Sequence, residues 1–287
     1  MRYALLDGYN LAFRAFYGMP ELTRADGFPT GALHGWVRTL WWVEDHVQAE
    51  ENLVFFDLGG ASRQTALRED YKANRTETPE ALEQQMPYIK EWTRAAGYRG
   101  IERDGVEADD LIAAYARRLA AEGHDVRIVS ADKDLGQLVT DRIHQLLPPP
   151  TANPKIGWRE LDPAEVEKKF GIRPDQIADY LAIVGDTSDN IPGLKGVGPK
   201  TAAKWLNQFG TLEEILAHSG ELQPKRLQQL VHAEAENLRL NRRMTLLDDD
   251  HDTEDPGVTG KDPGRALAIL REMEMGRTAE TYAGRIG

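Results

Sequence analysis

Short apolar runs that end in an aspartate recur along the first half of the chain. These runs and their aspartates are residues 3–6 with Asp7, 52–56 with Asp57, and 126–131 with Asp132. Longer stretches with the period of amphipathic helices separate them, so the pattern predicts an α/β fold with a mostly parallel twisted sheet flanked by helices. The carboxyl ends of parallel strands open onto one crevice. A single aspartate there is typical of a turn or a helix cap, but three together predict a cluster of carboxylates.

A second acidic group opens the next helix that the periodicity predicts. Glu107, Asp109 and Asp110 stand at its start. The apolar positions of its inner face are Leu111, Ile112, Tyr115 and Leu119. A helix N-terminus favours nearby negative charge, but three carboxylates within four residues repel one another unless a cation lies among them. We therefore interpret this helix start as one wall of a divalent-metal site.

A basic and mostly polar segment lies between the second apolar run and this helix. Its cationic residues are Arg63, Arg68, Lys72 and Arg75. They form either a solvated helix face or a phosphate-contacting surface beside the crevice. Residues 78–80 are typical of a helix start, and the helix expected at 80–96 is mostly polar. A polar helix with little to pack on predicts a mobile lid or arch.

Helical signals dominate the second half of the chain, after the proline-rich residues 148–154. Asp186 and Asp189 stand in a loop, and the glycine-rich residues 193–202 open a further helix. The lysines of this turn and helix are Lys195, Lys200 and Lys204. Such a turn exposes backbone N–H groups, so it predicts phosphate contact, the alternative being a purely structural helical hairpin. The acidic residues 248–252 are expected to be a solvated segment.

Composition narrows the chemistry of the crevice. The chain of 287 residues contains no cysteine, so oxygen or histidine ligands must hold any metal. The formal net charge of -12 argues against a nucleic-acid partner, unless many of the acids bind cations that offset them. The apolar run at the N-terminus is too short for a signal peptide or a membrane span, so a soluble cytoplasmic protein is expected.

Seven motifs, in chain order, resemble those of the bacterial and phage 5′ nuclease family. This flap endonuclease superfamily includes the 5′-nuclease domain of DNA polymerase I. The motifs are Asp7-Gly8 with residues 14–16, then residues 54–57, 71–75, 107–110 and 130–138, Gly185-Asp186 with residues 188–193, and residues 196–202. Each is short enough to arise by chance, but seven in the family's order are specific, and they cover almost the whole chain.

The resemblance implies a PIN-like 5′ nuclease fold in residues 1–150, with a helical arch over residues 71–97. Residues 151–287 would form an all-helical region with a helix–three-turn–helix motif over residues 185–210 and an acidic tail. Two or more Mg²⁺ or Mn²⁺ ions would be held by carboxylates. The implied metal ligands are Asp7, Asp57, Glu107, Asp109, Asp110, Asp132, Asp134, Asp186 and Asp189.

The same resemblance implies the remaining site residues. Lys72 and Arg75 would contact the scissile phosphate and act in catalysis with Asp7 and Asp110, while a base would stack on Tyr71. The glycine-rich turn would contact the backbone of downstream duplex DNA and hold a K⁺ ion through its carbonyls. Its DNA-contacting residues are Lys195, Gly196, Val197, Gly198, Lys200, Thr201 and Lys204. Two positions depart from the family pattern: Arg63-Gln64 replaces the usual Phe-Arg, and Tyr9 replaces a small polar residue.

The implied function is a structure-specific 5′ nuclease, a 5′-3′ exonuclease and flap endonuclease of DNA replication or repair. It would act as a free-standing monomer on DNA with 5′ flaps or free 5′ ends, and on RNA primers, leaving 5′-phosphate and 3′-hydroxyl ends. One alternative is a catalytically weak or silent DNA-junction-binding protein of the same fold. Another is an enzyme of different chemistry, an aspartyl-phosphate phosphatase or an RNA-cleaving relative. The first run ends in Asp7-Gly8-Tyr9 without an Asp-x-Asp pair, which disfavours the phosphatase.

Overall fold

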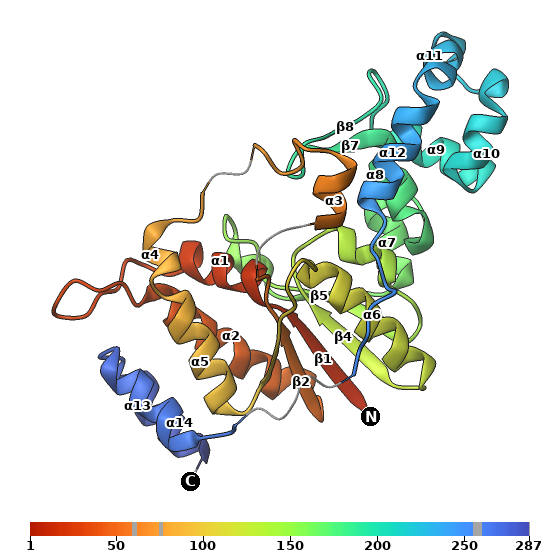
Figure 1. Ribbon diagram of the computed structural model, residues 1–287. Helices are drawn as coiled ribbons and strands as arrows, with labels where there is room; N and C mark the ends of the chain where they lie inside the picture. The colour runs from red at the N-terminus through yellow and green to blue at the C-terminus, as the bar shows by residue number, and fades with distance from the viewer. Residues whose placement is uncertain (59–61, 75–76, 255–259, 287) are drawn as a thin grey trace.

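A six-stranded sheet forms the centre of the N-terminal half (Figure 1). The computed structural model describes residues 1–58, 62–74, 77–254 and 260–286. The strands are β1 Arg2–Asp7, β2 Glu51–Phe55, β3 Arg99–Ile101, β4 Asp125–Val129, β5 Ile143–Leu147 and β6 Arg159–Leu161. Their order is β3-β2-β1-β4-β5-β6, and β6 alone runs antiparallel to its neighbour. The prediction of a mostly parallel sheet is confirmed.

Helices cover both faces of this sheet. The elements of this half are α1 Gly8–Gly18, α2 Gly31–Val47, α3 Ser62–Leu67, α4 Glu80–Glu83, α5 Met86–Ala96, α6 Ala108–Ala121 and the 3-10 helices η1 Asp134–Leu138 and η2 Pro154–Ile156. Ala4 and Leu6 of β1 share a core with α1, α2 and α5, whereas Leu5 packs with α6. Successive strand side chains point to opposite faces, so a strand buried on both faces has a continuous apolar sequence. The three apolar runs predicted as strands correspond to β1, β2 and β4.

The helix expected at residues 80–96 is divided into α4 and α5. The expectation that it has little to pack on is wrong, because Met86, Ile89 and Trp92 of α5 are buried in the core shared with α1 and α2. These apolar residues recur at every third position, so a narrow stripe is buried while the more numerous polar residues face outward. A mobile arch therefore stays a prediction only for the residues before α4.

Residues 163–245 form a mostly helical unit with one short hairpin. Its elements are α7 Pro163–Phe170, η3 Pro174–Gln176, α8 Ile177–Val184, the strands β7 Gly185–Asp186 and β8 Ile191–Pro192, α9 Pro199–Phe209, α10 Leu212–Ala217, η4 Ser219–Glu221, η5 Lys225–Leu227, α11 Gln228–Ala233 and α12 Ala235–Thr245. Asp162 caps α7, and Gly171 ends it in a left-handed conformation. The unit's core is built mainly from α8, α9 and α10 and includes the fully buried Trp205.

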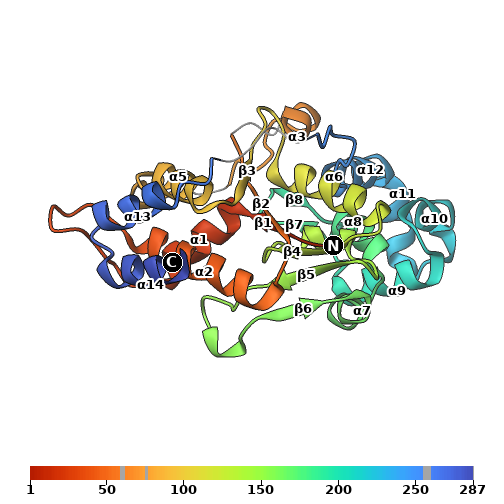
Figure 2. The ribbon, with the colours of Figure 1, turned by 90° about the horizontal axis from the view of Figure 1, so that it is seen from below.

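The last two helices return to the N-terminal half. α13 Pro263–Glu272 and α14 Gly276–Ile286 lie beside α5, at the opposite end of the molecule from α9, α10 and α11 (Figure 2). The ring of Tyr282 in α14 lies 5.8 Å from that of Trp92 in α5, and Arg285 pairs with Glu44 and Asp45 of α2. A helical hairpin therefore follows the acidic residues 248–252.

The acidic segment that follows α12 runs along α6. Arg117 of α6 pairs with Asp249 at 2.5 Å, and Arg103 donates to the backbone carbonyl of Asp252 at 2.7 Å. The expectation of a solvated segment is confirmed for Asp249, Asp250 and Asp252, which are exposed, and these contacts hold the segment against α6. Within the described ranges, no helix is both long and apolar enough to span a membrane.

Candidate metal and nucleic-acid site

A cavity of about 510 Å³ opens at the carboxyl ends of β1, β2 and β4. Asp7 ends β1, Asp57 and Asp132 follow β2 and β4, and Glu107 and Asp109 reach the cavity from the start of α6. The cavity lies where the strand order reverses beside β1, which is the usual ligand crevice of such sheets. The structure thus brings five of the implied metal ligands to one place.

The sequence around Asp7 aims its carboxylate into this cavity. A Cβ at Gly8 would lie 2.4 Å from the Phe56 ring, so a glycine is required where the strand turns into α1. Asp7 caps α1, its Oδ1 accepting from the backbone N–H of Asn10 at 3.1 Å and its Oδ2 from the Ser130 hydroxyl at 2.7 Å. Burial nevertheless raises the pKa of Asp7 to about 7. A neighbouring positive charge would favour its ionised form.

The other carboxylates of the cavity also lie close to neighbouring acids. Asp57 accepts a hydrogen bond from the backbone N–H of Ala108 at 2.7 Å and so fixes the first turn of α6. Burial raises the pKa of Glu107, Asp109 and Asp132, and the charges of neighbouring acids raise that of Asp109 further. Like charges held this closely disfavour ionisation unless a cation joins them.

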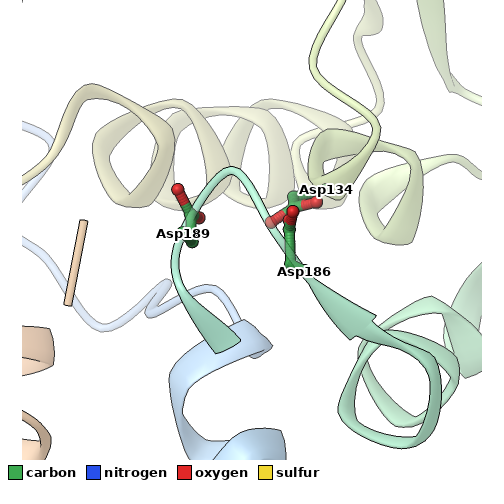
Figure 3. Close-up of side chains that lie close together, drawn as sticks. All are labelled: Asp134, Asp186 and Asp189. Carbon is green, nitrogen blue, oxygen red and sulfur yellow. The ribbon is translucent and has the colours of Figure 1, made fainter. Parts of the chain in front are cut away.

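A second acidic cluster is formed by Asp134, Asp186 and Asp189 (Figure 3). One carboxylate oxygen of each lies within 4.8 Å of the others. Asp134 begins η1, whereas Asp186 and Asp189 come from the β7–β8 hairpin. Burial raises the pKa of Asp134 well above its ordinary value, and its buried Oδ1 has no hydrogen-bond partner within the described ranges. A bound cation would satisfy such an oxygen.

The β7–β8 hairpin that carries two of these acids is unusually close-packed. Gly185 has a φ of +82°, and a Cβ on it would lie 2.3 Å from the backbone nitrogen of Gly193, so the motif requires glycine there. Lys133 donates to Asp186 at 2.6 Å. Burial alone would raise the pKa of Asp186, but the hydrogen bonds from Lys133 and Ser188 leave it below its ordinary value.

Asp110 lies apart from both clusters and is not among the described residues that line the cavity. Its carboxylate accepts hydrogen bonds from the Gln64 amide at 3.3 Å and from the backbone N–H of Asp248 at 2.8 Å. The Arg63 guanidinium lies 3.9 Å from it and also donates to two carbonyls at the end of α12. Arg63 and Gln64, which depart from the family pattern, therefore hold α3 against α6 and α12. The implied role of Asp110 as a metal ligand does not fit these surroundings.

Lys72 faces the carboxylates across the cavity. Its ammonium group pairs with the Glu107 carboxylate and lies 4.8 Å from the centre of the Tyr71 ring. The Tyr71 hydroxyl oxygen lies 3.2 Å from a Glu107 carboxylate oxygen and 3.4 Å from one of Asp189, so its single proton can be donated to either acidic cluster. Arg75, which was expected beside Lys72, lies outside the described residues.

The glycine-rich turn precedes α9. Gly196 has a φ of +79°, and Gly198 caps the helix without a side chain, which leaves the helix start accessible to an anion. Three lysines of this region are exposed: Lys195, Lys200 and Lys204. Thr201 is half-buried, and Val197 is buried in the core of the helical unit, so its side chain cannot contact DNA there. The turn thus presents a basic surface built on a packed support.

Three residues without a predicted role complete the site. Asn10 accepts a hydrogen bond from the backbone N–H of Ala131 at 3.1 Å, and the Ser130 hydroxyl accepts one from that of Asp132 at 3.0 Å. Lys133 is the cation closest to Asp186 in the acidic cluster. Phe13, Arg14 and Asn74 also line the cavity. Proximity in sequence to the strand-end aspartates is the signal that could have found Asn10, Ser130 and Lys133.

The donor set fits hard divalent cations. Its donors are carboxylate oxygens, the ligands that Mg²⁺ and Mn²⁺ prefer. Bound cations would lower the raised pKa values and would coordinate the Asp134 oxygen that lacks a hydrogen bond within the described ranges.

Two family models match consecutive parts of the chain. The model described as 5'-3' exonuclease, N-terminal resolvase-like domain, matches residues 2–171, and that described as 5'-3' exonuclease, C-terminal SAM fold, matches residues 172–265. These models divide the chain at the end of α7, whereas the sequence suggested residue 150.

Relatives of similar sequence include free-standing and polymerase-linked proteins. The 5'-3' exonuclease of Aquifex aeolicus is 36% identical over 275 residues, which cover 94% of this chain and 91% of that protein. The thermostable DNA polymerase I of Thermus thermophilus is 36% identical over 277 residues, which cover 96% of this chain and 32% of the polymerase. The chain therefore spans about a third of the length of the polymerase relatives that it matches.

Solved structures share the fold over nearly the whole chain. T5 5'-exonuclease with bound zinc ions has a TM-score of 0.71 at 23% identity, with 99% of each chain covered. The catalytic core of Rad2 in complex with DNA substrate has a TM-score of 0.62 at 16% identity, covering 95% of this chain and 87% of that chain. These likenesses confirm the predicted fold class. The family models and the Aquifex relative show that the chain belongs to the 5′-3′ exonuclease family.

Proposed function

We propose that this protein is a structure-specific 5′ nuclease that hydrolyses phosphodiester bonds of DNA with divalent metal ions. The observation that carries the proposal is the meeting of two acidic clusters and Lys72 at one site. Cations bound there would neutralise the clustered carboxylates, and a phosphodiester anion could then approach them. The expected products are a 5′-phosphate and a 3′-hydroxyl.

The residues divide into groups by position. Bound Mg²⁺ or Mn²⁺ would supply an activated water and neutralise charge on the scissile phosphate. The carboxylates that would hold these ions are Asp7, Asp57, Glu107, Asp109 and Asp132 in the cavity, and Asp134, Asp186 and Asp189 beside it. Lys72 would exchange its pairing with Glu107 for a phosphate oxygen, adding positive charge where negative charge develops. Arg75 stays the predicted companion of Lys72, and Asp110 would anchor α3 rather than bind metal.

The substrate would be DNA with a 5′ flap or a free 5′ end. The exposed lysines beside the glycine-rich turn would pair with phosphates of the duplex part, and the K⁺ ion implied by the resemblance would bind backbone carbonyls of that turn. Support comes from the T5 D15 flap endonuclease, whose structure is a pseudo-enzyme-product complex with DNA and metal ions. RNA primers offer the same phosphodiester chemistry. One chain supplies every proposed residue, so a monomer would suffice.

The test is cleavage of an end-labelled 5′-flap duplex in Mg²⁺, with EDTA and Ca²⁺ as controls. We expect incision near the junction in Mg²⁺, products with 5′-phosphate ends, and no cleavage with EDTA. The Asp132→Asn variant keeps the shape of a cavity carboxylate and removes its charge, so it should bind the flap but cleave it orders of magnitude more slowly. Tight binding by the unaltered protein without any cleavage would instead favour the junction-binding alternative.

A further inference from the structure

The turn that carries Lys72 is fastened to the loop that carries two of the clustered aspartates. We name residues 70–74 the lysine turn and residues 186–190 the aspartate loop. Besides the contact of the Tyr71 hydroxyl with the Asp189 carboxylate, three hydrogen bonds between backbone and side-chain amide groups join them. They run from the Lys72 backbone N–H to the Asp189 carbonyl at 3.2 Å, from the Asn74 side-chain amide to the Thr187 carbonyl at 2.6 Å, and from the Asn190 side-chain amide to the Asp70 carbonyl at 2.8 Å. These three bonds leave the metal-binding carboxylates to other partners.

Lys72 depends on such support because of its backbone conformation. Its φ is +57°, in the left-handed region that a lysine rarely adopts. A backbone in this region persists only where the surrounding structure holds it. The aspartate loop can provide that hold, because its own shape is set by hydrogen bonds from the backbone N–H and hydroxyl of Ser188 to Asp186 at 3.0 and 2.6 Å.

We propose that Asn190 and Asn74 are positioning residues that set the place of the Lys72 ammonium relative to the acidic clusters. The inference rests on the proposed function, in which Lys72 meets the scissile phosphate. Asn190 reaches the backbone of Asp70 and is not among the described residues that line the cavity, so it acts through the lysine turn. The aspartate loop leads directly into the glycine-rich turn before α9. Duplex DNA held at that turn would therefore be placed in register with Lys72.

The test removes the two amides separately. Asn190 has a φ of +59°, so Asn190→Gly removes the side chain while glycine still adopts this conformation easily. Asn74→Ala breaks the bond to the Thr187 carbonyl; because Asn74 also lines the cavity, Asn190→Gly is the variant that isolates the positioning role. Gln48→Gly is the matched control, because Gln48 is exposed beyond α2 and has a φ of +52°. For each variant we measure the single-turnover rate of cleavage of a 5′-flap duplex and the affinity for the flap in Ca²⁺. We also measure the Mg²⁺ midpoint, which is the Mg²⁺ concentration that gives half of the maximal cleavage rate.

We expect both asparagine variants to cleave the bound flap about 10- to 100-fold more slowly, since a small misplacement of a reacting group has effects of this size. Their flap affinity and Mg²⁺ midpoint should match those of the unaltered protein, and Gln48→Gly should match it throughout. An unchanged cleavage rate in Asn190→Gly and Asn74→Ala would overturn the inference. A rate loss accompanied by a higher Mg²⁺ midpoint would also overturn it, because Asn190 would then act on Asp189.

A double variant gives a second test of whether Asn190 acts through Lys72 or on Asp189. In a Lys72→Ala background, Asn190→Gly should slow cleavage no further, because the group that it positions is already absent. Equal slowing in both backgrounds would contradict the inference. An unaltered protein that binds the flap and never cleaves it would refute the proposed function instead, so the two failures can be told apart.

Discussion

Asparagine in place of Asp7 should stabilise the metal-free protein at high pH and change it little at low pH. Burial raises the pKa of Asp7 from its ordinary value of 3.8 to about 7. The folded protein therefore keeps a proton that the unfolded chain loses near pH 4. The free energy of unfolding falls on this account as the pH rises from about 4 to about 7, and the loss stays constant above that range.

The size of the effect follows from the two pKa values. An ionised Asp7 in the folded protein costs up to about 4 kcal/mol relative to the unfolded chain. Asparagine fits the same place, because its carbonyl can accept from the Asn10 N–H and its amide can donate to the Ser130 hydroxyl oxygen. Asparagine is also as good a helix N-cap as aspartate. The substitution therefore removes charge and changes little else.

The assay is urea unfolding in EDTA, followed by tryptophan fluorescence at about pH 5 and about pH 8. The stability advantage of Asp7→Asn should grow by up to about 3 kcal/mol between these conditions. The control is Asp141→Asn. Asp141 is exposed and precedes β5, at the end of the strands opposite to the cavity. Mg²⁺ should stabilise the unaltered protein more than Asp7→Asn. An advantage that is equal at both pH values, or a variant that is less stable at the higher pH, would refute the reasoning.

Asp110→Asn should slow single-turnover cleavage much less than Asp132→Asn, because only Asp132 lines the cavity; equal losses would return Asp110 to the set of metal ligands. Replacing Lys200 and Lys204 together by alanine should lower the slope of log affinity against log salt by about one to two for flaps that contain duplex. Binding of single strands should not change, and an unaltered slope would mean that the turn does not contact duplex. Trp92→Ala should lower the free energy of unfolding in urea by about 3–5 kcal/mol, because this residue is fully buried. A loss below about 1 kcal/mol would argue that α5 is loosely packed.

The strand-end part of the site could be predicted because it depends on local sequence. Asp7, Asp57 and Asp132 each follow an apolar run, and neighbouring parallel strands bring their carboxyl ends together. The strands β3, β5 and β6 were missed. β3 and β6 have three residues each and carry arginine, glycine or glutamate in place of an apolar run, and histidine and glutamine interrupt the apolar residues of β5. The places of β3 and β6 in the sheet come from pairing with β2 and β5 rather than from their own pattern.

The direction of Asp110 could not be predicted in the same way. Successive helical residues point about 100° apart, so Asp109 and Asp110 cannot both face one cavity. The sequence does not say which one turns away, because the groups that hold Asp110 are distant along the chain. Gln64 is 46 residues away and Asp248 is 138 residues away. The buried face of α5 has the same origin, since Trp92 packs near Tyr282 of α14.

The return of α13 and α14 to the sheet means that the helical unit from α7 to α12 is attached at both of its ends. One connection enters through α7, and the other leaves along α6 beside Asp249. A body connected by one segment can turn about that segment, whereas a body connected by two has fewer ways to move. A duplex bound at the exposed lysines of α9 would therefore move less relative to the carboxylates than a duplex held by a unit with a single connection.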